Sequence, residues 1–142
     1  GQLASDYRFH VFNGKCEFIN ISQPGSKTQP RRTVNVFTPD WEPLDMRLNN
    51  FPQSNEAIPR PQRLIEMIDI AERLSNNIDF VRVDLYNPTP EKIYVGELTN
   101  YPMGGTQKFA PKKWNYELGI KLLLDDKISQ ESKPHPRSQS VV

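Results

Sequence analysis

Two carboxylates and one arginine are the side chains of this sequence best suited to chemistry. Arg82 and Asp84 lie in a strictly alternating segment, Phe80 to Tyr86, and Glu97 lies near the end of the next apolar segment. Residues two positions apart in a strand share a face, so Arg82 and Asp84 point the same way. A hairpin that turns between Tyr86 and Lys92 brings Asp84 and Glu97 close together.

Such a carboxylate pair needs a cation or a proton between its members, because two like charges a few ångströms apart repel each other. Mg2+ prefers oxygen ligands and commonly shares one or two carboxylates with substrate phosphates. Arg82 can bind a phosphate or a carboxylate through two parallel hydrogen bonds. The pattern predicts a metal–phosphate site, with a solvated strand face as the alternative. The glycine turn at Gly104-Gly105 favours the site, because glycine lets a ligand approach the backbone.

The first part of the chain is predicted to form the strands beside this site. Asp6 to Phe12 alternates, and Asn13-Gly14 after it favours a tight hairpin turn, so Lys15 to Ile21 is expected to be the returning strand. Arg32 to Phe37 alternates and predicts a third strand. Residues 42–59 have no sustained period and are expected to be an irregular excursion, a lid or a substrate-side loop.

The remaining pattern predicts two helices and a second hairpin. Pro61 to Leu74 carries an apolar stripe at three- and four-residue spacing, and Pro111 to Leu124 is a second helix candidate. We therefore expect an α+β fold, a mostly antiparallel sheet with two helices on one face. Residues 1–126 are expected to form one domain and residues 127–142 a polar, mobile tail.

Composition narrows the classes of function. The chain has 142 residues, with 18 basic and 17 acidic side chains, and this balance argues against a nucleic-acid binder. No apolar run approaches the roughly 20 residues of a membrane helix, so no membrane span is expected. Cys16 is the only cysteine, which excludes a disulfide framework within one chain. His10 is expected to be a partly exposed strand residue, on the face with Arg8 and Phe12.

Several segments together resemble the TupA-like ATP-grasp family over residues 6 to about 125. They are Asp6 to Lys15, Phe80-Val-Arg-Val-Asp-Leu-Tyr86, Ile93-Tyr-Val-Gly-Glu-Leu-Thr99, Tyr101-Pro102, Gly105 and Phe109-Ala-Pro111. The resemblance implies a ligase that uses ATP and Mg2+ to activate a carboxylate as an acyl phosphate, which an amine then attacks. It also implies the fold of an ATP-grasp C-terminal lobe.

The resemblance assigns roles to individual residues. It implies that Asp84 and Glu97 hold Mg2+ and that Arg82 stabilises the acyl phosphate. The superfamily often has asparagine two positions after the glutamate as a third ligand. That position is Thr99 here, and Asn100 comes one step later, so the choice between the two stays open. Arg8 and Lys15, in the matching segment Asp6 to Lys15, are the candidates for contacts with the nucleotide.

The resemblance also implies partners and a setting. ATP and a carboxylate substrate are expected, with a saccharide or amino-acid-like acceptor, in cell-surface polysaccharide or teichuronopeptide-type synthesis on the cytoplasmic side. No lysine-bearing nucleotide lobe is visible before Asp6, so we expect the C-terminal half of a ligase, a fragment or a degenerate copy, weak or inactive alone. Exposed strand edges make a homo-oligomer conceivable. The alternatives are a non-catalytic binding module of the same fold and a glycosyltransferase-type protein.

Overall fold

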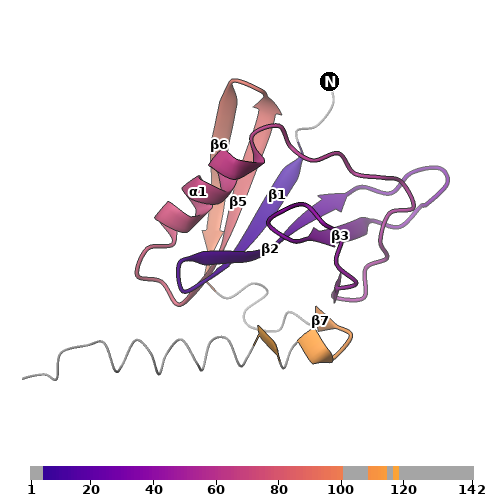
Figure 1. Cartoon of the computed structure of the whole chain (residues 1–142). Coiled ribbons are helices and arrows are strands. Elements are labelled where there is room, and N and C mark those ends of the chain that lie inside the picture. The colour runs from indigo at the N-terminus through magenta and orange to yellow at the C-terminus, as the bar shows by residue number, and fades with distance from the viewer. Residues whose placement is uncertain (1–4, 101–108, 115–116, 119–142) are drawn as a thin grey trace, which may run out of the picture.

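The computed structural model describes residues 5–100, 109–114 and 117–118. Five strands form one antiparallel sheet in the order β3-β2-β1-β5-β6, and the short strands β4 and β7 pair separately. The elements in chain order are β1 Asp6–Phe12, β2 Lys15–Gln23, β3 Thr33–Phe37, β4 Arg47–Leu48, α1 Leu64–Leu74, β5 Phe80–Thr89, β6 Lys92–Thr99 and β7 Phe109–Ala110. Helix α1 lies across one face of the sheet (Figure 1). The α+β class is confirmed.

The first hairpin turns where the sequence predicts. Asn13 and Gly14 both have positive φ, 50° and 82°, which is the backbone of the tight turn that matches the twist of paired strands. This turn makes β2 the antiparallel partner of β1 on one side, and β5 pairs with β1 on the other. β1 is therefore central in the sheet.

Helix α1 covers the apolar face of the central strands. It begins at Leu64 rather than at Pro61, and Leu64, Met67 and Ala71 are its buried residues. They pack with alternate residues of the strands; those from β5 are Val81, Val83 and Leu85. Asn77, just beyond the helix, has φ 63°, a left-handed conformation that asparagine tolerates and that is common after helix ends. Alternation then sends the other β5 side chains, among them Arg82 and Asp84, to the opposite face.

A second apolar cluster lies on that opposite face. It consists of Phe12, Phe18, Val34, Val36, Met46, Leu48 and Leu118, with Trp114, Phe80 and Phe109 packed against it. The excursion at 42–59 contributes β4 and the buried Met46 to this cluster, so this part of it packs on the sheet.

The helix count differs from the expectation. The described residues contain one named helix, and most of the predicted helix from Pro111 to Leu124 lies outside them. Trp114 and Leu118 do belong to the described part, and they pack in the cluster opposite α1. The expectation of two helices on one face is therefore wrong. The predicted tail, 127–142, lies outside the described residues, and none of the described helical segments has the length and hydropathy of a membrane span.

The contribution of α1 can be measured with two substitutions on the same helix. Met67 is fully buried, whereas 73% of Ile65 is exposed. We expect Met67→Ala to lower the free energy of unfolding by roughly 2–5 kcal/mol, because it removes buried apolar contacts and leaves a cavity. Ile65→Ala should change it by no more than about 0.5 kcal/mol. Urea denaturation measures both, and similar losses in the two variants would contradict this packing.

Candidate metal and phosphate site

Polar side chains from β1, β5 and β6 form three rows on the sheet face opposite α1, here called the polar face. The rows follow from the strand register, in which β5 pairs with β1 on one side and with β6 on the other. Written from β1 to β6, the rows are Asp6–Tyr86–Tyr94, Arg8–Asp84–Glu97 and His10–Arg82–Thr99. The predicted proximity of Asp84 and Glu97 therefore corresponds to direct cross-strand pairing.

Arg82 and Asp84 form the central ion pair of the polar face. Arg82 Nε donates to Asp84 Oδ1 at 2.8 Å, and Arg82 Nη2 donates to Oδ2 at 2.9 Å. The side chains are only 13% and 4% exposed. Glu97 Oε2 lies 3.9 Å from the same Nη2, and the Glu97 side chain is 65% exposed. Two carboxylates from neighbouring strands thus converge on one guanidinium group.

Arg8 connects this ion pair with Asp6, in the row Asp6–Tyr86–Tyr94. Its Nε lies 3.1 Å from Asp6 Oδ2 and 4.0 Å from Asp84 Oδ2. The pKa of Asp84 is nevertheless raised above its ordinary value, because burial outweighs the hydrogen bond from Arg82. Nearby positive charge stabilises the ionised form of a buried carboxyl. The carboxylate of Asp84 would therefore gain from a further cation.

The donor set fits Mg2+ that shares its coordination with phosphate. The oxygens of Asp84 and Glu97 already converge on a single cationic group. Thr99 Oγ1, in the adjacent row, is buried without a hydrogen-bond partner among the described residues. Within that same part of the chain, no cluster of three or more His, Cys, Asp or Glu side chains is arranged to hold a metal. A magnesium ion here would complete its shell with water and phosphate, as Mg2+ usually does.

Not every candidate residue joins this set. Arg8 does, but Lys15 is exposed at the turn end of β2, where it pairs with Phe12. That is four residues along β1 from Arg8, about 13 Å at the usual rise of a strand. Asn100 is exposed and follows the end of β6, whereas Thr99 lies within the strand. Of the two candidates for a third ligand, Thr99 is the one in the rows.

The expectation for His10 is wrong, because its side chain is fully buried. Its Nε2 lies 2.6 Å from Oδ1 of Asn20, which is buried in β2. A register shift between His10 and Val11 accompanies this contact, and such bulges re-aim side chains. Asn20 could have indicated the burial of His10 from the sequence. It is a lone polar residue in the apolar run Phe18 to Ile21, and a buried amide requires a hydrogen-bond partner.

A family model described as TupA-like ATPgrasp matches residues 2–123. The chain belongs to the TupA-like ATP-grasp family. The resemblance drawn from the sequence is confirmed. No curated protein and no solved structure gave a significant match. ATP-grasp proteins as a class bind ATP with Mg2+ and act on a carboxylate substrate, which is the chemistry that the polar face suits.

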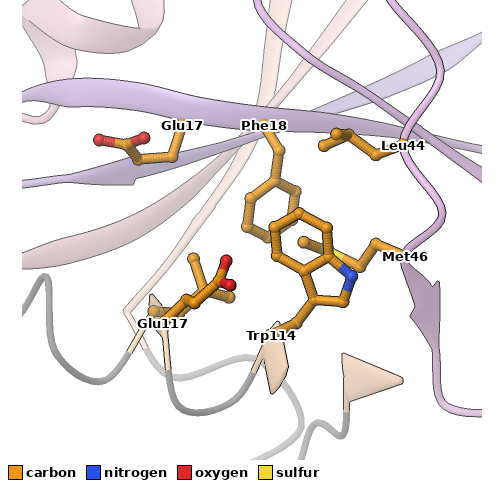
Figure 2. Close-up of a pocket in the computed structure, with 7 residues that line it drawn as sticks. Glu17, Phe18, Leu44, Met46, Trp114 and Glu117 are labelled. Carbon is orange, nitrogen blue, oxygen red and sulfur yellow. The ribbon is translucent and has the colours of Figure 1, made fainter. Parts of the chain in front are cut away.

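A pocket of this ATP-grasp chain has no lining residue in common with the three rows of the polar face. Its lining residues are Glu17, Phe18, Leu44, Met46, Trp114, Glu117 and Leu118. Figure 2 shows the indole of Trp114 beside Phe18 and Met46, with the carboxylate of Glu117 rising towards them. Five of these seven side chains are apolar or aromatic, and the other two are acidic, so the pocket is unsuited to phosphate. The polar face is the better candidate for the phosphate groups of ATP.

The electrostatics of the ATP-grasp chain's ion pair can be tested directly. Burial raises the pKa of Asp84 and Arg82 opposes this shift, so we expect Arg82→Met to raise this pKa further. Arg73→Met, at an exposed ion pair with Asp69 on α1, should leave it unchanged. NMR titration of the Asp84 carboxyl carbon measures the pKa. An unchanged or lower value in Arg82→Met would contradict the pair.

Proposed function

We propose that this chain carries the magnesium- and acyl-phosphate-binding half of an ATP-dependent carboxylate–amine ligase. The observation that supports the proposal is the convergence of Asp84 and Glu97, paired across β5 and β6, on the single guanidinium of Arg82. A site that holds one cation between two carboxylates has the charge and spacing to take another. Membership of the ATP-grasp family supplies ATP as the phosphate source.

Three residues are proposed as ligands of the metal. Asp84 and Glu97 provide carboxylate oxygens from adjacent strands, and Thr99, two positions after Glu97, provides a hydroxyl oxygen. We prefer Thr99 to Asn100 because Thr99 lies within β6 beside the ion pair. Bound Mg2+ would neutralise charge on the transferred phosphoryl group. The protein holds its ligands on rigid strands, so little reorganisation is needed at the moment of reaction.

The arginines are proposed to bind the anionic groups. Arg82, once freed from Asp84, can donate two hydrogen bonds to the oxygens of an acyl phosphate. Arg8 adds a second positive charge in the neighbouring row, 4.0 Å from Asp84, where it can contact a nucleotide phosphate. Lys15 stays a sequence-based prediction, since the fold places it away from this set.

The finer parts of the proposal concern substrates and setting. We propose that a carboxylate substrate takes the phosphoryl group of ATP to form an acyl phosphate, and that an amine then displaces the phosphate. The proposed acceptor is a saccharide or resembles an amino acid. The resemblance to the TupA-like family supports a role in cell-surface polysaccharide synthesis on the cytoplasmic side.

Removing one carboxylate tests the metal site. Glu97→Gln is the cleaner variant, because the side chain is exposed and its substitution leaves the buried pair intact. We expect Glu97→Gln and Asp84→Asn to weaken Mg2+ binding by more than about tenfold in calorimetric titrations. The matched control is Asp69→Asn, which removes a carboxylate on α1 that is paired with the exposed Arg73. Unchanged affinity in Glu97→Gln and Asp84→Asn would refute the ligand assignment.

Nucleotide selectivity tests the reaction class. In the proposed site, Arg8, Arg82 and the metal together contact the phosphate groups of ATP. We therefore expect ATP to bind only with Mg2+ present. Calorimetry with ATP and with a nucleotide sugar separates the proposed ligase from the glycosyltransferase alternative. Binding of the nucleotide sugar without binding of ATP would overturn the proposal.

A further inference from the structure

A divalent cation that takes the positions of Arg82 on both oxygens of Asp84 displaces the guanidinium, which donates one hydrogen bond to each of these oxygens. Arginine keeps its charge under all physiological conditions. Its side chain is only 13% exposed here, so solvent gives little help to a displaced guanidinium. A buried charge without a hydrogen-bond acceptor is costly. Glu97 lies 3.9 Å from Arg82, but the proposed metal takes this carboxylate too, so a displaced Arg82 needs another acceptor.

His10 is placed to be that acceptor. It lies directly opposite Arg82 in the register of β1 and β5, on the same face. Its Nε2 contacts the side-chain oxygen of Asn20, which only accepts, so Nε2 carries the proton and Nδ1 carries a free lone pair. Nδ1 is buried and has no hydrogen-bond partner in the described part of the chain. Nearly all buried polar atoms have a partner, so this one requires an explanation.

The surroundings of His10 keep it neutral and fixed. Burial, with smaller contributions from the charges of Arg82 and Arg8, lowers its pKa to about 3 against the opposing effect of the hydrogen bond with Asn20. Phe18 stacks on the imidazole with 4.1 Å between ring centroids, and Phe80 lies at 6.3 Å. A neutral ring in this position remains an acceptor throughout the physiological pH range.

We propose that His10 is a positioning residue whose Nδ1 accepts a hydrogen bond from Arg82 when a divalent cation takes the oxygens of Asp84. This inference rests on the metal site of the proposed function. It gives Arg82 two alternative partners in adjacent rows, Asp84 without the cation and His10 with it. In the second state the guanidinium remains on the polar face with other N–H groups free to meet phosphate oxygens.

A double-mutant cycle in the full chain tests this role with Mg2+ alone. His10→Phe keeps an aromatic ring on Phe18 but removes the acceptor, and we expect Mg2+ affinity to fall about tenfold, the usual worth of a hydrogen bond to a charged group. His10→Gln, which can donate to Asn20 and still accept from Arg82, should restore most of the affinity. In an Arg82→Met background, His10→Phe should change the affinity by less than about twofold.

The outcomes separate positioning from packing. If His10→Phe weakens Mg2+ binding equally in the Arg82 protein and in the Arg82→Met variant, the role of His10 is merely structural and the inference is overturned. No weakening with Arg82 present would also overturn it. Thermal unfolding of each variant, followed by circular dichroism, shows whether the fold is intact under the conditions of titration.

An NMR measurement on the metal-free protein distinguishes this inference from the proposed function. The imidazole nitrogen shifts of His10 should report the Nε2–H tautomer with an unprotonated Nδ1. A proton on Nδ1 would overturn the role of His10 and leave the ligand assignment untouched. Mg2+ binding that is absent, or unaffected by Asp84→Asn, would instead refute the metal site, and the inference would fall with it.

Discussion

The polar face depends on one interaction, the buried ion pair of Arg82 and Asp84. Burying two charges costs several kcal/mol per ion in desolvation, which a single contact in good geometry only partly offsets. Here two parallel hydrogen bonds, at 2.8 and 2.9 Å, and the nearby groups Arg8 and Glu97 supply the compensation. Such a pair is weak evidence of stabilisation. Arg82 lies between two carboxylates, and under the proposed function it would hold Asp84 and Glu97 together in the absence of a metal.

The sheet makes this arrangement possible because β5 presents apolar side chains on one face and charged side chains on the other. Alternation along β5 gives α1 its apolar contacts from Val81, Val83 and Leu85, and it gives the polar face Arg82 and Asp84. Pairing with β1 on one side and β6 on the other fixes the rows. A register slip of one residue would bury the charges under the helix and expose the apolar side chains. Packing by α1 therefore holds the charged rows in register.

The sequence was informative wherever a local period or turn determined the structure. The Asn13-Gly14 turn, the α1 stripe and the facing of Asp84 and Glu97 all depend on neighbours within one or two elements. The errors concern contacts between distant elements. The apolar pattern that includes Trp114 and Leu118 does not say which face of the sheet these two side chains pack on. His10 is buried because Phe18, Phe80 and Asn20 enclose it, and no alternation pattern distinguishes such a histidine from one that faces solvent.

The charge of the polar face links its geometry to phosphate chemistry. In the three rows, the carboxylates of Asp6, Asp84 and Glu97 stand against the guanidinium groups of Arg8 and Arg82, and burial keeps His10 neutral. The rows therefore carry one net negative charge when the carboxylates are ionised, which attracts a divalent cation. A bound divalent cation would make the net charge of the rows positive by one, which would attract a phosphate group in turn. Under the proposed function, this count of charges favours a metal that binds before the phosphate or together with it.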